Sequence, residues 1–467
     1  MSKRIRFALA AVAVLMALFA GLSQPSASSS SSAESLRPLR LCGECFSPAA
    51  AQQTAARNAA LIAATQNVLK ETSAIRQLSI LRPVQSSAQS RTEIERSLIK
   101  SLDEDTTPAE IHADEVTLKK LGLAPADFQY RALMLRVLTE QVAGYYDPKT
   151  RQFHLADWID LDGQKPIMAH ELTHALQDQH FNLRRFEHWP KGDSDAELAA
   201  HALIEGDATL AMALYVANNP LVALAFLKSL GAAGMASEEL DKAPRALRES
   251  LLFPYQDGEK WVNALYKRGG WTEVSQAFAT LPQSTEQILH PEKYFAHEAP
   301  VKVTLPDIAP ALNAGSRGTG VPPVTHAQDA RATWKRIADD VQGEWGLYLI
   351  LDQFLKSPAE SRRAAAGWGG DRFAVYEGPK GEILIASLSA WDTENDAREF
   401  FDAYVKRTEL RYPGAERLPN PDVASPNSVS WKTSEGEVTV EIRGLRVRVI
   451  EGIPDRLDSN SLLKSAW

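Results

Sequence analysis

The chain has 467 residues, with 51 Lys and Arg against 59 Asp and Glu, a net charge of −8 and only two cysteines. The length suggests two or three domains, and 44% hydrophobic with 24% charged residues argues against global disorder and against a multi-span membrane protein. The negative charge offers no basic field for nucleic acid. Two cysteines cannot staple a chain of this size, so buried cores must stabilise it.

The N-terminus predicts an export signal. Lys3, Arg4 and Arg6 precede a run without polar side chains, Phe7–Leu22, and small residues then offer cleavage points up to Ala27. This order is typical of a secretory signal peptide over residues 1–27, and the apolar run is short for a membrane span. We expect an exported protein, periplasmic or extracellular. The alternative is that the segment stays uncut as a membrane anchor.

Residues 26–35 are mostly Ser and Ala, so the segment 28–47 is expected to be a flexible linker. This linker contains a CxxC pair, Cys42 and Cys45. A redox site would need a βαβ pattern, and a zinc knuckle would need a second CxxC or a His pair. Neither follows, so we interpret the two cysteines as structural or incidental.

Residues 48–305 predict a mostly helical domain, because Leu and Ile recur at three- and four-residue spacing. Within it, residues 141–155 predict a β-hairpin, since two β-prone runs flank Asp-Pro. The patterns then predict a helix from Pro166 to about Gln179. A second helix should open with a capping box at 194–197 and end before Pro220.

Residues 306–331 are rich in Pro, Gly, Ala and Ser and predict a linker or surface insertion. Residues 332–467 change to an α+β pattern. The fold class expected for the whole chain is therefore α+β: a helical domain with an edge hairpin, then a smaller α+β C-terminal domain. In this C-terminal domain the expected elements are strands Phe373–Glu377, Glu382–Ala390 and Val438–Ile450, and a helix Thr393–Arg411.

Six of the ten histidines lie between His154 and His201, and two of them stand one turn apart in His170-Glu171-Leu172-Thr173-His174. Histidines at i and i+4 share one helical face and can bind one ion. Glu171 lies about 100° around the helix, so it can hold a water molecule instead of binding the metal. Zinc lowers the pKa of such a water to about 7, and a carboxylate can then take its proton.

Three residues compete as the third metal ligand. His180 has the metzincin spacing, but Gln177 stands where that pattern has a glycine turn, so the helix should carry His180 away. His201 and Glu205 lie one turn apart on the second helix, which is apolar on nearly every side. A buried carboxylate needs a partner, and a metal ion is a suitable one. We therefore favour Glu205, with His201 as its neighbour.

The glycine that follows this carboxylate is unusual inside a helix. Gly206 costs about 1 kcal/mol there relative to alanine. It therefore predicts the close approach of another backbone.

The two-histidine motif followed by a glutamate on the next long helix resembles the gluzincin group of zinc metallopeptidases. The resemblance implies a zincin-like catalytic domain with one Zn²⁺ ion, in which the motif glutamate is the general base and an edge strand holds extended peptide. The implied roles fall on the zinc ligands His170, His174 and Glu205, the base Glu171, and the strand residues Tyr145 and Tyr146.

A closer resemblance, from about residue 60 onward, is to largely uncharacterised exported bacterial proteins. It rests on the segments 144–147, 170–178, 205–208 and 284–294. The chain departs from the gluzincin pattern at Thr209, where an aspartate is expected, so Asp178 or Asp207 should supply that carboxylate. No motif marks an oxyanion-stabilising residue. His290 or Tyr294 could fill that role, or His290 could simply end a short helix.

These expectations combine into an exported zinc metallopeptidase acting on protein or peptide substrates. Two alternatives stay open: a catalytically silent zincin-fold scaffold of the cell envelope, and a zinc hydrolase of a non-peptide substrate. The intact Glu171 argues against the scaffold, which would not need a general base.

Overall fold

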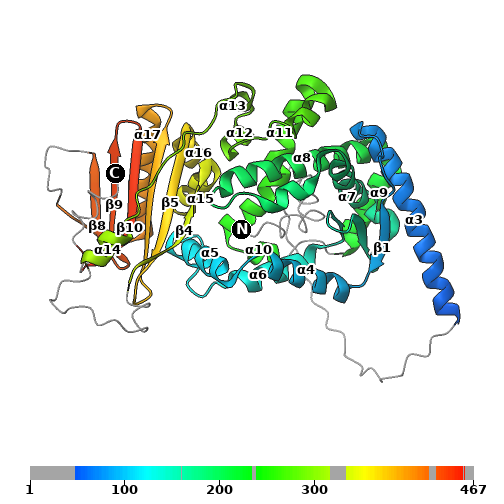
Figure 1. The fold of residues 1–467 in the computed structure, drawn as a ribbon, viewed down its shortest axis with the longest axis horizontal. Helices are drawn as coiled ribbons and strands as arrows, with labels where there is room; N and C mark the ends of the chain where they lie inside the picture. The colour runs from blue at the N-terminus through cyan, green and yellow to red at the C-terminus, as the bar shows by residue number, and fades with distance from the viewer. Residues whose placement is uncertain are drawn as a thin grey trace, which may run out of the picture.

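The computed structural model describes residues 48–158, 160–233, 238–315, 333–419, 427–455 and 457. The export signal, the linker with its cysteine pair and residues 316–331 of the expected insertion lie outside the described residues. Figure 1 shows an elongated molecule with a helical region at one end and an antiparallel sheet at the other. The α+β fold class is confirmed.

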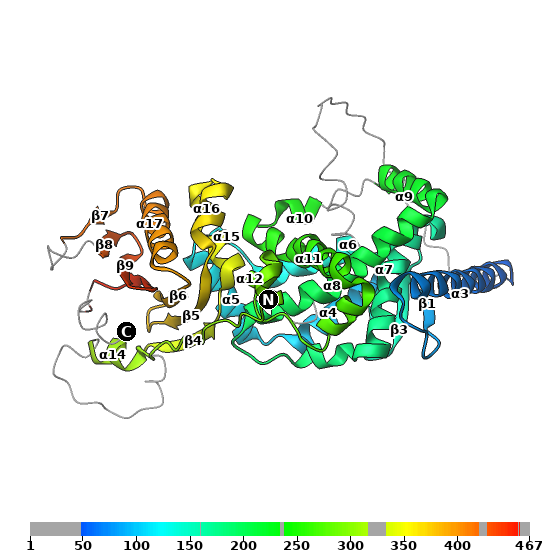
Figure 2. The ribbon, with the colours of Figure 1, turned by 90° about the horizontal axis from the view of Figure 1, so that it is seen from above.

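The helical region is built around three long helices that carry or cover the candidate site, α7, α8 and α11 (Figure 2). Smaller helices surround them. In chain order the helices are α3 (Pro48–Arg76), α4 (Arg91–Asp105), α5 (Pro108–Lys120), α6 (Tyr130–Gln141), α7 (Leu161–Phe181), the 3₁₀ helix η1 (Leu183–His188), α8 (Ser194–Asn218), α9 (Pro220–Ala233), α10 (Glu238–Lys242), α11 (Arg245–Ala277), α12 (Thr285–Leu289) and α13 (Pro291–Phe295).

A three-stranded sheet lies beside α7. The expected hairpin is confirmed as β2 (Gly144–Asp147) and β3 (Gln152–Ala156), with Tyr146 opposite Phe153. A further strand, β1 (Gln85–Gln89), pairs in parallel with β3 and was not predicted. Its sequence, QSSAQ, has none of the β-branched or aromatic residues that mark strands. The strand order β1-β3-β2 leaves β2 at an edge.

The two helices expected to carry the metal ligands are confirmed, with different starts. α7 begins at Leu161, because Asp160 accepts hydrogen bonds from the amides of Asp162 and Gly163, and Pro166 lies inside the helix. At the start of α8 the capping residue is Asp193, which accepts from the Ala196 amide, so the predicted capping box at 194–197 is wrong.

The backbones of α8 and α11 touch at two glycines. A Cβ added to Gly206 would lie 2.3 Å from the carbonyl carbon and oxygen of Gly258, and a Cβ on Gly258 would lie 2.3 Å from the Ala202 carbonyl oxygen. The close approach predicted from Gly206 is therefore confirmed. It brings α11 directly over the turn of α8 that carries Glu205.

The C-terminal region is a seven-stranded antiparallel sheet in the order β4-β5-β6-β10-β9-β8-β7. The stretch predicted as one strand over 438–450 is wrong: Gly444, with φ +54°, turns the chain into a hairpin. The remaining elements are α14 (Ala309–Gly315), β4 (Lys335–Asp340), α15 (Gly343–Leu355), α16 (Pro358–Ala365), β5 (Trp368–Glu377), β6 (Ile383–Trp391), α17 (Glu394–Arg411), β7 (Glu416–Arg417), β8 (Ser428–Thr433), β9 (Gly436–Arg443) and β10 (Arg446–Ile453).

Alternation along the strands gives this sheet two apolar faces. Val375 and Ile385 pack with α15, α16 and α17, whereas Tyr376 and Leu384 pack with Leu312 of α14. This period of two explains why the central strands are rich in Val, Ile and Tyr.

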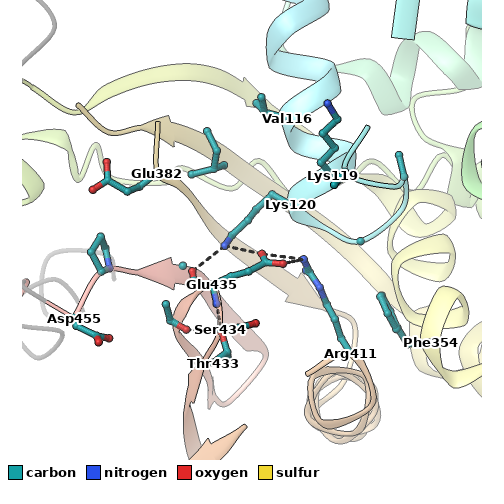
Figure 3. A pocket seen from close by; sticks show the side chains of 17 residues that line it. Val116, Lys119, Lys120, Phe354, Glu382, Arg411, Thr433, Ser434, Glu435 and Asp455 are labelled. Atoms are coloured by element: carbon teal, nitrogen blue, oxygen red, sulfur yellow. Dashed lines mark hydrogen bonds and ion pairs between the residues drawn. The ribbon is translucent and has the colours of Figure 1, made fainter. Parts of the chain in front are cut away.

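The two regions meet at a groove of about 990 Å³ between α5 and the ends of β6, β9 and β10 (Figure 3). Lys120 Nζ of α5 lies 3.0 Å from a carboxylate oxygen of Glu435, and Arg411 of α17 reaches the same carboxylate at 3.2 Å. Beneath it, the buried Glu451 accepts from Arg407 at 2.5 Å and from Arg411 at 2.9 Å. The largely buried Lys120 therefore fastens α5 to the exposed Glu435, and the buried Glu451 holds Arg407 and Arg411.

Among the described residues, no single helix is long and apolar enough to cross a membrane. α8 and α9 pass such a test only when taken together, and they are bent by 107°.

Candidate metal centre

Three side chains from α7 and α8 converge on one point. His170 Nε2 lies 3.1 Å from His174 Nε2 and 3.2 Å from Glu205 Oε2, and His174 Nε2 lies 3.3 Å from the same oxygen. Each residue is only 1–2% exposed. Ligand atoms about 2.0–2.1 Å from a tetrahedral zinc lie about 3.3 Å apart. The three atoms are thus spaced as the ligands of one zinc ion would be.

The hydrogen bonds of Gln177 fix the tautomer of His174. The Gln177 side-chain nitrogen donates to the Ile204 carbonyl at 3.0 Å and to Asp207 at 2.9 Å. Its oxygen must therefore accept from His174 Nδ1, 2.9 Å away. A proton therefore sits on Nδ1, which leaves Nε2 as the nitrogen that could bind a metal ion.

The chain of contacts behind Gln177 ends in a buried ion pair. Asp207 accepts from Arg76 Nε of α3 at 2.5 Å, and both side chains are 0% exposed. The Arg76 guanidinium also stacks on Trp271, 4.5 Å from the ring centre. Asp207 therefore lies behind the group of His170, His174 and Glu205 and contacts His174 through Gln177.

Glu171 lies beside the three ligand atoms and is not one of them. Its Oε2 accepts from the backbone amide of Tyr146 on β2 at 2.8 Å. Its Oε1 is buried and has no hydrogen-bond partner within the described part of the chain. Burial raises the pKa of Glu171 to about 8, although His174 and the Tyr146 amide favour the charged form. A buried carboxyl group with one oxygen unused is suited to exchanging a proton.

The three residues of this group influence one another's ionisation. Burial opposes the charged form of Glu205, but the neighbouring imidazoles outweigh it and lower its pKa to about 2. Burial would also lower the pKa of His174, but Glu205 raises it to about 9. Burial lowers the pKa of His170. A metal cation would replace the proton shared by this group.

Tyr255 of α11 completes the wall of the site and was not predicted. Its ring centre is 6.2 Å from that of His170, and its hydroxyl hydrogen-bonds Glu205. The side chain is 2% exposed, and burial together with the carboxylates of Glu205 and Glu171 raises its pKa, so it stays a hydrogen-bond donor. In the sequence, Tyr255 is marked only by its position directly after Pro254 inside a long helical pattern, which does not indicate a contact with Glu205.

The other residues singled out from the sequence lie around this group at different distances. Asp178 accepts from the Tyr146 hydroxyl at 3.0 Å and from Arg82 at 2.8 Å, which ties β2 to α7. His201 donates through Nδ1 to the Glu197 carbonyl of its own helix. Tyr145 points away from α7: its ring is 4.9 Å from His154, and its hydroxyl donates to Gln89.

The two oxyanion candidates have partners elsewhere. His290 Nε2 lies 3.0 Å from Glu344 of α15, and the Tyr294 hydroxyl donates to the Thr280 carbonyl at 2.7 Å. Tyr294 also packs edge-on against Trp261. None of these contacts involves the metal-ligand group, so the structure gives both side chains packing roles. His180, the rejected third ligand, donates to the Ser79 carbonyl, as expected of a side chain carried away by the helix.

A second acidic group could also hold a cation, but it already has one from the protein. Glu286, Glu298 and Asp392 place carboxylate oxygens close together. Lys293 Nζ lies 2.6, 2.8 and 2.5 Å from them. The ammonium group of Lys293 lies among the three carboxylates, where a cation would lie, so within the described residues the group of His170, His174 and Glu205 is the stronger candidate metal centre.

Replacing Gln177 should weaken zinc binding while leaving the ligands in place. In Gln177→Leu, His174 Nδ1 loses its acceptor and Asp207 loses a donor. We expect about 10- to 100-fold lower zinc affinity, measured by competition with a chromophoric chelator. Gln179→Leu is the matched control, because Gln179 lies on the same helix but binds the backbone of Leu81 and Arg82. Equal affinity in the two variants would contradict the role of Gln177.

The comparisons with known proteins do not reach the candidate metal centre. No curated protein and no solved structure matches the chain. Residues 331–462 match a sequence family described as a domain of unknown function (DUF8575). This range contains the seven-stranded sheet with α15–α17, and neither α7 nor α8.

Proposed function

We propose that the protein is a zinc-dependent peptidase of the gluzincin type. The observation that carries the proposal is the convergence of His170, His174 and Glu205 at 3.1–3.3 Å, with Glu171 beside them and outside the ligand set. The resemblance to gluzincins, which rests on these same residues, points to the same chemistry. An N-terminal export signal would make this an exported enzyme.

Zinc, when bound, supplies Lewis acidity that polarises a carbonyl group and makes water more acidic. The chain's own residues supply the rest. Glu171 takes a proton from the attacking water through its unpaired oxygen and returns it to the leaving amine. Gln177 holds His174 in the tautomer that binds metal, and Tyr255 holds Glu205.

The position of β2 favours a peptide over other carbonyl compounds. β2 is an edge strand, and its Tyr146 amide points to Glu171 instead of to β3. An extended peptide that pairs with this edge would run directly past Glu171. The four polar residues of the site are 1–2% exposed, so substrate binding must first open the layer over them.

The test compares wild type with Glu171→Gln for metal content and for hydrolysis of a peptide library. We expect about one zinc per chain in both proteins, and a loss of about 10²- to 10⁴-fold or more in hydrolysis for the variant, because the amide cannot accept a proton. A folded protein without zinc would refute the metal centre. Zinc without cleavage of any peptide would refute the peptidase and leave a scaffold or a hydrolase of another substrate.

A further inference from the structure

A stripe of leucines on α9 lies exposed to solvent. Leu221, Leu224 and Leu227 are 83%, 50% and 46% exposed and follow one another at three-residue spacing along one side of the helix. Large apolar side chains scattered singly are ordinary on a protein surface, but three in a row on one helix face indicate a contact surface.

The opposite side of α9 is fixed to the protein. Phe226 is 3% exposed, and Val222 packs into the cluster that contains Val68 of α3. Just before the helix, Asn219 donates to Glu71 of α3 at 3.3 Å. Because its other side is packed against the protein, α9 presents the leucine stripe to solvent. Figures 1 and 2 show α9 and α3 at the same end of the molecule.

The composition of α9 suits a lipid surface. In a chain of net charge −8, this helix contains no acidic residue, and its only charged residue is Lys228, which is exposed. Its 14 residues span about 21 Å, less than the roughly 30 Å hydrocarbon core, so it can lie on a bilayer but not cross it. Lys228 lies one turn beyond Leu224, on the same side of the helix as the leucines. Its long stem can carry the ammonium group to the headgroups while the apolar side chains insert among the acyl chains.

The sequence also carries an apolar run, Phe7–Leu22, which is expected to be an export signal or, if it stays uncut, a membrane anchor. Residues 23–47 join it to Pro48 at the start of α3, and 25 residues reach at most about 80–90 Å. A bilayer that held this run could therefore also be contacted by α9, whose Val222 packs into the cluster that contains Val68 of α3.

We propose that α9 docks on the surface of a lipid bilayer, with Leu221, Leu224 and Leu227 inserted among the acyl chains. This proposal is independent of the metal centre. It commits to lipid as the partner, and a second copy of the chain is the competing occupant that the experiment separates.

The experiment uses the full chain with Cys42 and Cys45, its only cysteines, replaced by serine. An environment-sensitive fluorophore is attached at Leu224→Cys. A matched protein carries it at Leu410→Cys, which is 49% exposed on α17. Both are mixed with vesicles of phosphatidylethanolamine and phosphatidylglycerol that contain nitroxide-labelled lipid.

We expect a blue-shifted emission at position 224 and several-fold stronger nitroxide quenching there than at position 410. Adding Leu221→Ser and Leu227→Ser should return the quenching to the level of the control, since tethering alone does not need the leucines. Equal quenching at both positions overturns the proposal. A blue shift without quenching that disappears on dilution also overturns it, and assigns the leucine stripe to a second copy.

Discussion

Gly206→Ala should lower the free energy of unfolding by about 3 kcal/mol, although alanine is the better helix former by about 1 kcal/mol. The added methyl carbon would lie 2.3 Å from backbone atoms of Gly258, where carbon atoms normally stay about 3.5–4.0 Å apart. Neither backbone can rotate away, so α8 and α11 must separate. Because Glu205 precedes Gly206 and Tyr255 lies on α11, zinc binding should weaken as well.

The measurements are chemical denaturation and zinc titration. Gly346→Ala is the matched control: Gly346 is also inside a helix, α15, but its Cβ would meet only the flexible Gln342 side chain, at 3.2 Å. We expect that variant to be neutral or slightly stabilised. Similar behaviour of the two variants would show that the α8–α11 contact yields more easily than its geometry indicates.

Glu451→Gln should destabilise the protein by about 3–5 kcal/mol, because it leaves buried positive charge uncompensated. Arg407 and Glu451 are both 0% exposed, and Arg411 is the second cation on this carboxylate. Arg407 also donates to the Leu121 carbonyl at 2.7 Å, at the end of α5. Losing Glu451 should therefore loosen the junction of Figure 3 together with the sheet.

The pH dependence of this effect has a definite sign. Burial opposes ionisation of Glu451, but Arg407 and Arg411 outweigh it and lower its pKa. A carboxyl group with a lowered pKa stabilises the folded state above its unfolded pKa of about 4.3, and this stabilisation is lost as the pH falls through the folded value. Wild type and Glu451→Gln should therefore differ fully at pH 7 and converge in acid.

The control for this variant is Glu360→Gln, which removes the exposed pair with Lys406 between α16 and α17. An exposed pair of this kind contributes about 0–1 kcal/mol. Denaturation curves for both variants and wild type, recorded at pH 7 and at a series of values below pH 4, make the comparison. A Glu451 variant no less stable than the Glu360 variant would contradict the argument from buried charge.

Local patterns could predict the parts of the site that lie within one helix. His170 and His174 share a face because of the helical repeat alone, and the sequence shows that repeat directly. Glu205 lies on another helix, so it was predicted from the argument that a buried carboxylate needs a cation and from the resemblance to gluzincins. The close backbone approach at Gly206 could be predicted for a similar reason. Glycine destabilises a helix, so its presence inside one indicates a compensating contact.

The supporting residues depended on tertiary packing and were harder to find. Gln177 was weighed only as the residue in place of a glycine, although its position one turn after His174 put it within hydrogen-bonding reach. Arg76 lies 131 residues from Asp207 in sequence, and no local pattern joins them. His290 and Tyr294 were considered because segment 284–294 resembles exported bacterial proteins. In the structure both side chains contact residues outside the candidate metal centre.

The secondary structure shows the same division. The β2–β3 hairpin and the helix of residues 394–411 follow from periodicity and turn residues. The polar strand β1 forms because it pairs in parallel with the edge of β3. Its own sequence, QSSAQ, does not predict a strand. The single strand predicted over 438–450 failed at Gly444, where the apolar alternation resumes too soon after the turn to be separated from it.

The order of the large sheet bears on when the protein can fold. β10, the last of its seven strands to be synthesised, lies in the middle and pairs with both β6 and β9. Until residue 453 has emerged from the ribosome, the growing chain holds two half-sheets with open edges and no central strand to join them. The sheet and the helices that pack on it must therefore assemble late, by long-range contacts that form slowly.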